Sequence, residues 1–413
     1  MIQSIKRLWG NKRGNALIIM AGALPLVIGS AGLASDTIQW VLWKRQLQRA
    51  ADSAALAGVY ARFQSASATS AVTADLAKNN KLWVALLSGY PATTTPADTS
   101  SFQKQVQVSL AVQQSLGFSS VFLATAPTIS VTARAAAIDD GIFCMDALAK
   151  TGSAITIGGS ANVNLGCGAI SNSGDATASV GTNGNSFNFT ASPVAGVGGL
   201  PSSINGATDL QPYHLALPDP FAGLYPTDVP TGQTCYNNIN ATKYTGADGK
   251  THVPAGCYNS FNPGNGETVL DAGQFYLNNT GLSTNGTTTI TGTGVTVIFT
   301  GTNPGSLSMN GNSVINLTAP PTGTYAKMLF IQAANATAEN SNTINGNNGS
   351  GFDGAMYFPN GNLTFTGSSS AATKCAMVVA WRIDMTGNTN MQNNTTGCTA
   401  NRTVTGKKIR LVA

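Results

Sequence analysis

Six cysteines are the residues whose type and spacing could most readily do chemistry in this chain of 413 residues. Taken in chain order, the six cysteines form three successive pairs, and the two cysteines of each pair lie 22 or 23 residues apart in the sequence. No CxxC motif is present and only two histidines, His214 and His252, accompany them, which disfavours metal ligation. We expect three disulfide bonds formed in an oxidising compartment; sequence alone leaves every pairing open, and the spacing favours nearest neighbours. The six candidates are Cys144, Cys167, Cys235, Cys257, Cys375 and Cys398.

Carboxylates are the second group that could do chemistry, because paired acids hydrolyse glycosidic bonds. In this chain they are scattered, and charged residues make up only 9% of the sequence. Asp139 and Asp140 are neighbours, but adjacent residues of a strand face opposite sides. No GxSxG motif accompanies the two histidines. We expect no catalytic residue, no cofactor and no metal site.

An apolar run from Ala16 to Ala34 determines where these side chains are located. It is long enough to cross the ~30 Å hydrocarbon core of a bilayer as a helix. Lys6, Arg7, Lys12 and Arg13 precede it and should stay cytoplasmic. We therefore predict a basic cytoplasmic segment over residues 1–15, a transmembrane helix over 16–34 and a large domain outside the membrane.

A cleaved signal peptide is the alternative for this segment, because Gly32 and Ala34 would suit a signal peptidase. The run is longer than a usual signal peptide core, however, and helical sequence continues to Arg62. Ala50, Ala54 and Gly58 recur every four residues along that extension. Such a stripe of small residues lets another helix pack closely, although it also occurs in any good helix former.

The sequence around this helix resembles a known family. Arg13-Gly14-Asn15-Ala16 leads into the apolar run, and Leu47-Gln48-Arg49-Ala50-Ala51-Asp52-Ser53-Ala54-Ala55-Leu56-Ala57-Gly58 follows it. This pattern resembles the N-terminal module of TadG-like proteins of the tight-adherence (Flp) pilus system. The resemblance implies a bacterial inner-membrane protein that works in pilus assembly or adherence. Some TadG-like proteins carry a DxSxS metal site, but Phe102 occupies the last position after Asp98 and Ser100 here.

Residues 35–140 are predicted to form a helical extension and a small α+β neck. The segment 70–88 suits a short helix, and residues 104–112 and 129–138 alternate apolar and polar side chains as half-buried strands do. We expect the two strands to pair antiparallel and to pack on the helix.

From residue 141 to 413 the composition shifts to Gly, Asn, Thr and Ser, with short apolar strands between Gly/Asn corners. We predict a mainly β protein in which this region is a right-handed parallel β-helix-like solenoid with coils of ~20–25 residues. Cysteines one coil apart could then be joined, because adjacent strands lie ~4.8 Å apart. A jelly roll or sandwich is the alternative. The Pro-rich segment at about 193–232 should leave the stack as an insertion.

These features predict a structural or adhesive protein, anchored in the bacterial inner membrane by one helix, with its C-terminal domain in the periplasm or at the cell surface. Other pilus-assembly or pilin-like proteins should contact the N-terminal helix. The net charge of +5 gives no case for nucleic-acid binding, since four cations lie in the first 13 residues. The alternative function is that of a surface polysaccharide-binding or polysaccharide-cleaving β-helix protein.

Overall fold

The chain forms two compact units, residues 1–139 with 407–413 (unit 1) and residues 140–406 (unit 2). The computed structural model describes residues 12–78, 85–184, 186–224, 226, 228–345, 349–367, 370–374, 376–394 and 404–412. The boundary falls inside β3 (Thr128–Ala147), and the chain leaves unit 2 within β29 (Val404–Leu411). The distal domain expected over 141–413 differs at its end, because Val412 donates its backbone N–H to Arg134 in unit 1.

Unit 1 is built on one long helix, α2 (Lys12–Phe63), which runs through Pro25. After it, Ser67 caps a second helix, α3 (Ala68–Lys78), by accepting the backbone N–H of Ser70 at 3.3 Å. The helix expected over 70–88 is shorter than predicted at its end. Residues 79–84 lie outside the described residues, and Leu87 donates its N–H to Ala111 instead of continuing a helix.

Three antiparallel strands pack on these helices. The hairpin expected from the alternating pattern is present, since β2 (Gln103–Gln113) pairs with β3 and also with the short β1 (Ala92–Thr94). The buried side chains Val106, Val108 and Leu110 share one face, as the period of two requires. They join the helix residues in a single core.

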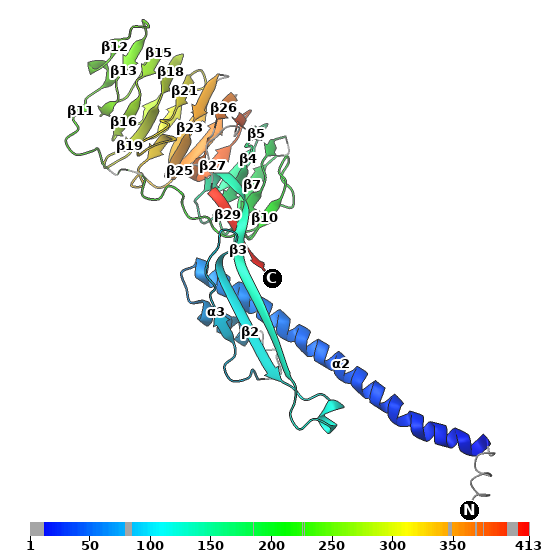
Figure 1. The fold of residues 1–413 in the computed structure, drawn as a ribbon. Coiled ribbons are helices and arrows are strands. Elements are labelled where there is room, and N and C mark those ends of the chain that lie inside the picture. The colour runs from blue at the N-terminus through cyan, green and yellow to red at the C-terminus, as the bar shows by residue number, and fades with distance from the viewer. Residues whose placement is uncertain are drawn as a thin grey trace, which may run out of the picture. The chain divides into compact units, whose positions relative to one another are not determined.

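Unit 2 contains three ladders of parallel strands (Figure 1). In spatial order, ladder 1 consists of β11 (Cys235–Tyr236), β14 (Gly256–Tyr258), β16 (Gly273–Asn278), β19 (Val295–Thr300), β22 (Met328–Gln332), β25 (Ala355–Thr366), β27 (Val378–Met385), β3, β6 (Gly168–Ser171), β9 (Val194–Gly196) and β10 (Leu210–Pro212). Ladder 2 consists of β17 (Leu282–Ser283), β20 (Leu307–Met309), β23 (Asn340–Asn345), the second halves of β25 and β27, β4 (Ile155–Gly158) and β7 (Val180–Asn183).

Ladder 3 carries rows of Asn and Thr. It consists of β13 (Thr251–Val253), β15 (Gly266–Leu270), β18 (Thr288–Thr293), β21 (Val314–Thr318), β24 (Ser350–Asp353), β26 (Ser370–Lys374), β28 (Asn390–Asn394), β5 (Asn162–Asn164) and β8 (Asn188–Thr190). The short β12 (Tyr244–Thr245) joins its end antiparallel to β13. Two 3-10 turns, Ser119–Val121 and Ile239–Ala241, complete the described elements.

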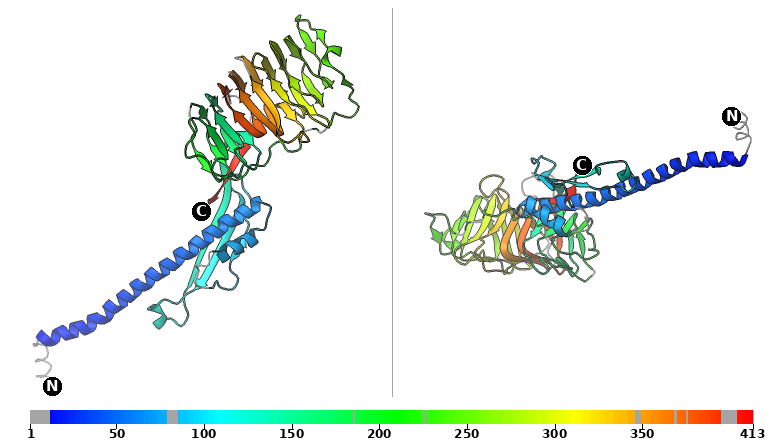
Figure 2. Two further views of the ribbon diagram at one scale, coloured as in Figure 1. Left: turned by 180° about the vertical axis from the view of Figure 1, so that it is seen from behind. Right: turned by 90° about the horizontal axis from the view of Figure 1, so that it is seen from below.

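The order of strands in unit 2 does not follow the order of the chain. The chain enters at β3, builds outward to β10 and then returns to begin the opposite end at β11. From β11 the strands stack back until Val378 of β27 pairs with Met145 of β3. Figures 1 and 2 show the early strands in green on one side of the orange β27, and the later green and yellow strands on its other side. The first and last parts of unit 2 are therefore neighbours.

The strands of ladder 1 are apolar because both of their faces are buried. In β19 every residue is buried, and so is every residue of β22. One face, with Phe299 and Phe330, belongs to the main core. The other, with Ile298 and Tyr357, is covered by residues 213–234, which we call the strap.

The predicted insertion at about 193–232 differs from the structure in its first half, because β9 and β10 lie within it and continue ladder 1. The prolines in and beside β9 and β10 are tolerated because no ladder hydrogen bond needs their missing N–H group. Pro193 only accepts a hydrogen bond, from the N–H of Ala169, and Pro212 lies in the last strand of the ladder. Only the strap leaves the ladders. Several pairings also depart from the predicted coil length, since Val297 pairs with Phe330, and Ser308 with Thr343, across a longer segment that contains Pro320 and Pro321.

Candidate functional site

The first half of α2 exposes the apolar side chains that the sequence assigned to a membrane. Leu26 is 75% exposed and Leu24 and Val27 are more than half exposed, so none of the described residues of unit 1 covers them. By length and composition, the helix over Ile19–Phe63 is suited to cross a membrane. A core helix of a soluble protein would bury such residues, whereas a lipid-facing one exposes them.

The second half of α2 holds unit 1 together. Ala50 and Ala54 are buried in the core that the helix shares with β2 and β3. Gly58 lies where a Cβ atom would come within 2.8 Å of Val106 and 3.3 Å of Val72. The small residues therefore allow close packing inside unit 1. Their use by a helix of another protein stays a prediction.

Asp36 joins α2 to the β2–β3 loop (residues 114–127). Its carboxylate accepts the backbone N–H groups of Phe118 at 2.9 Å and Ser119 at 2.5 Å, and the hydroxyl of Ser119. Asp36 is only 3% exposed, because the loop covers it. One helical turn before Asp36, a Cβ atom on Gly32 would overlap the ring of Phe118. The loop is thus fixed to the helix just beyond the apolar run.

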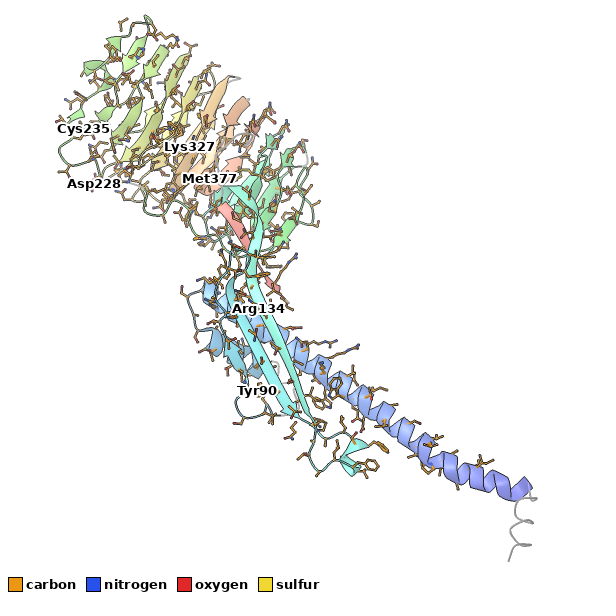
Figure 3. The ribbon with its side chains drawn as sticks, viewed as in Figure 1. Tyr90, Arg134, Asp228, Cys235, Lys327 and Met377 are labelled. Carbon is orange, nitrogen blue, oxygen red and sulfur yellow. A yellow bond between two sulfur atoms is a disulfide. The ribbon has the colours of Figure 1, made fainter. Side chains whose placement is uncertain are left out.

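The cysteines of unit 2 form disulfides between neighbouring strands of ladder 1. Cys144 is bonded to Cys167 with Cα atoms 5.9 Å apart, and Cys235 is bonded to Cys257 with Cα atoms 4.4 Å apart. Cys235 and Cys257 are also register partners of β11 and β14. Figure 3 labels Cys235 and, at the same end of unit 2, Asp228 of the strap. Cys375 and Cys398 lie outside the described residues.

The acids and histidines remain dispersed. Asp139 pairs with Lys407 in unit 1, whereas Asp140 lies 3.7 Å from Nε2 of His214 in unit 2. His252 lies between Asp271 at 2.8 Å and Asp248 at 3.1 Å, and the hydrogen bond that it donates to Asp271 raises the pKa of His252. Among the residues that the structure describes, no group of three His, Cys, Asp or Glu side chains is arranged to hold a metal ion.

Asp146 is the one acid in an unusual environment. It is fully buried on β3, and burial together with the nearby charge of Asp219 raises its pKa well above the usual value. One carboxylate oxygen accepts the side-chain N–H of Asn172 at 3.3 Å, and the other has no hydrogen bond. Asp219 belongs to the strap and accepts the hydroxyl of Tyr357. Asp146 is therefore covered and does not lie in an open cleft, which suits it poorly for attack on a substrate.

The strap contacts ladder 1 through a few specific residues. Phe221 is buried with its ring 5.3 Å from that of Tyr357. Leu217 exchanges two hydrogen bonds with the side chain of Asn172. Tyr213 is 69% exposed, and Tyr225 lies outside the described residues.

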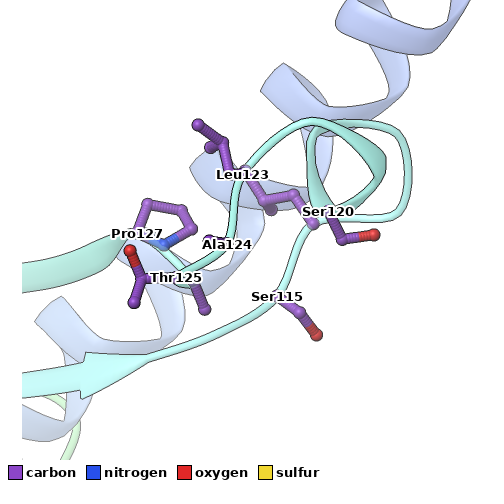
Figure 4. Close-up of a pocket in the computed structure, with 8 residues that line it drawn as sticks. Ser115, Ser120, Leu123, Ala124, Thr125 and Pro127 are labelled. Atoms are coloured by element: carbon purple, nitrogen blue, oxygen red, sulfur yellow. The ribbon is translucent and has the colours of Figure 1, made fainter.

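Two concave surfaces occur in the described parts of the chain. The first, of about 240 Å³, is formed by the β2–β3 loop and includes Ser115, Leu123 and Pro127 (Figure 4). The second, of about 340 Å³, is an open groove across β18, β21 and β24, lined by Thr291, Asn316 and Asp353 among others. Asp353 is the only acid that lines it, so the paired carboxylates of a glycosidase are not assembled there.

Comparison with protein families finds a match within the first unit. Residues 14–68 match the family described as "Tad: Putative Flp pilus-assembly TadE/G-like". Residues 14–68 are a TadE/G-like segment. The match confirms the resemblance seen in the sequence, and it covers the exposed apolar helix, the stripe of small residues and the start of α3. No curated protein and no solved structure matches the chain.

Sequence reasoning missed two features outside the TadE/G-like segment. The apolar tip of the β2–β3 loop had a usable signal, since no charged residue occurs between Lys104 and Arg134. The buried Asp146 had none, because the residues that surround it, Asn172 and Asp219, come from distant parts of the chain.

Proposed function

We propose that this chain is a membrane-anchored structural component of the Tad (Flp) pilus-assembly machinery, without enzymatic activity. The observation that carries the proposal is that the TadE/G-like match, residues 14–68, coincides with an apolar helix whose side chains are not covered by the other described residues of unit 1. In this proposal α2 crosses the bacterial inner membrane once. The basic N-terminus stays in the cytoplasm, and unit 2 lies in the periplasm or at the cell surface.

We further propose that unit 2 is a right-handed parallel β-helix. The chain visits ladder 1, ladder 2 and ladder 3 in turn through most of unit 2, and every pairing within the three ladders apart from that of β12 is parallel. Connections between parallel strands of one sheet are right-handed in nearly all proteins, which supports that hand. The disulfides between neighbouring strands support an oxidising compartment. Such a solenoid is a rigid arm that could hold a binding surface away from the membrane.

The anchor is tested by complementing a strain that lacks the gene. A chain without residues 1–35 is expected to be soluble and folded, and to leave the cells without pili under the electron microscope. The matched control replaces residues 16–34 with an unrelated apolar segment of equal length, which should restore membrane retention. If the truncated chain supports pilus formation, the proposed role of the anchor is wrong.

Polysaccharide binding is the second candidate, and the groove of ladder 3 is the observation that favours it. Its hydroxyl and amide groups, from Thr291, Thr293 and Asn316, resemble the polar surfaces that contact sugar hydroxyls. The test is binding of full-length protein to surface glycans of the same bacterium. A Thr291→Ala, Asn316→Ala double variant should bind several-fold more weakly, while equal binding would exclude the groove.

A further inference from the structure

The β2–β3 loop ends in an apolar tip that points into solvent. Val121 is 75% exposed, Phe122 72% and Leu123 52%, and the three residues are consecutive. The tip is ordered, because Ser119–Val121 form a 3-10 turn and the rings of Phe118 and Phe122 lie 5.2 Å apart. A soluble surface rarely presents three large apolar side chains side by side without a partner.

The position of this tip along α2 is fixed by contacts within unit 1. The carboxylate of Asp36 holds the backbone of Phe118 and Ser119, and the ring of Phe118 lies against Gly32. Gly32 belongs to the apolar run, whose last residue is Ala34. The loop therefore lies beside the helix at the level where the predicted membrane span ends.

The chemistry around the tip suits a lipid boundary. No charged residue occurs between Lys104 and Arg134, so both strands that lead to the loop are neutral near it. Among the described residues 32–36 of α2 and 105–133 of the hairpin, Asp36 carries the only charged side chain. Two backbone N–H groups and a hydroxyl donate hydrogen bonds to its carboxylate. On the neighbouring helix Trp40 and Lys44 form a cation–π contact of 5.0 Å, a pairing suited to the headgroup region. No unmatched charge would have to enter the acyl region with the loop.

We propose that residues 118–123 insert into the outer leaflet of the bilayer that α2 crosses, so that unit 1 binds the membrane at two places. The inference rests on the proposed membrane anchor and adds a second contact to it. Because Val121, Phe122 and Leu123 come from the hairpin and not from the helix, their insertion would fix the rotation and tilt of unit 1 at the membrane surface. A single helix alone leaves both free.

The test uses the full-length chain, reconstituted without other proteins into phospholipid vesicles. A cysteine introduced by Phe122→Cys is labelled, without reductant, with a fluorophore whose emission shifts to the blue in an apolar environment. Nitroxide lipids then report its depth. Two control positions are Leu26→Cys in the apolar run and Tyr213→Cys, an exposed aromatic residue of unit 2. The unsubstituted protein gives the background from native cysteines.

We expect the probe at position 122 to shift to the blue and to be quenched roughly twofold or more above the probe at 213, as for a side chain at the acyl boundary. The depths of the probes at positions 26 and 122 distinguish the anchor proposal from the loop-insertion proposal. A buried probe at 26 with a water-exposed probe at 122 overturns the loop insertion and keeps the anchor. Water-exposed probes at both positions overturn the anchor itself.

Two further measurements keep the inference falsifiable. If Phe122→Cys does not fold, Val121→Cys takes its place, since it is equally exposed and has no ring contact in the loop. If the probe is shielded only in native membranes and not in pure lipid, the tip binds a protein and the lipid proposal is wrong. A Phe122→Ser, Leu123→Ser variant should keep the anchor but lose the blue shift of a probe at position 121.

Discussion

Units 1 and 2 treat their apolar residues in opposite ways. In unit 1 the first half of α2 and the β2–β3 loop expose large apolar side chains, while charged residues are concentrated in the second half of the helix. In unit 2 the apolar residues of ladder 1 are buried on both faces, and Asn and Thr recur on the surface of ladder 3. The difference teaches that the exposed surfaces of the two units suit different solvents. One surface is suited to lipid, and the other needs neither lipid nor many charges to stay in water.

The largest expected effect tests the burial side of this contrast. Phe330→Ala should destabilise unit 2 by about 3–5 kcal/mol, because Phe330 is completely buried and the centroid of its ring lies 6.1 Å from that of Phe352. Leu26→Ala removes an equally apolar but exposed side chain and should change the free energy of unfolding by less than about 0.5 kcal/mol. Thermal unfolding of both variants in detergent measures this. Similar losses in the two would contradict the contrast.

Replacing a glycine by valine should have different effects on stability in the two halves of α2. Gly58→Val should cost about 1–3 kcal/mol, because the new side chain would meet Val106 and Val72 in the core of unit 1. Gly22→Val is the matched control, since no atom lies within 4 Å of a Cβ at that position. The free energy of unfolding in detergent distinguishes them. If both substitutions were tolerated, the small residues would have no packing role inside unit 1.

A pH experiment examines the buried acid of unit 2. Burial and the charge of Asp219 raise the pKa of Asp146, so the folded state binds a proton more tightly than the unfolded state. Stability should therefore fall as the pH rises from the unfolded pKa near 3.8 through the folded pKa. Asp146→Asn should remove this decline and stabilise the protein by about 1–3 kcal/mol at neutral pH. Denaturant unfolding from pH 4 to 8 measures both effects.

Asp175 provides a control of opposite sign. Backbone N–H groups of Thr177 and Ala178 lower its pKa, so its contribution is present above the unfolded pKa and is lost as the pH falls. Asp175→Asn should weaken the protein at neutral pH instead of stabilising it. The same direction of change in both variants would refute the assignment of Asp146 as an unfavourably buried charge.

The smallest expected effect concerns the exposed end of ladder 3. The hydrogen bond that His252 donates to Asp271 raises the pKa of His252, with Asp248 as a second partner. Asp271→Asn should lower the pKa of His252, as followed by its ring proton signals in an NMR titration. Because His252 contributes stability in its protonated form, that contribution should then be lost at a lower pH than in the unsubstituted protein. An unchanged pKa would show that Asp248 alone sets it.

The sequence predicted the features that depend on local pattern. The exposed helix, the antiparallel pairing of β2 with β3 and the β-rich character of unit 2 follow from apolar periodicity and turn residues. The parallel ladders also follow from short strands with Gly and Asn corners. The position of β9 and β10 in ladder 1 could not be predicted in this way, because prolines are excluded only where a ladder needs their N–H group. The strap and the burial of Asp146 depend on contacts between distant residues, which no local pattern encodes.

The pairing of β27 with β3 has a consequence for biogenesis. Met145 is synthesised early, whereas its partner Val378 follows only after most of unit 2 has been made. Until then the strands from β3 to β10 carry an open edge that could pair with another chain. Contacts so distant in sequence also form slowly. Completion of this seam therefore has to wait for residues near the end of unit 2, and a nascent chain that is halted before residue 378 should be the species that chaperones and proteases capture.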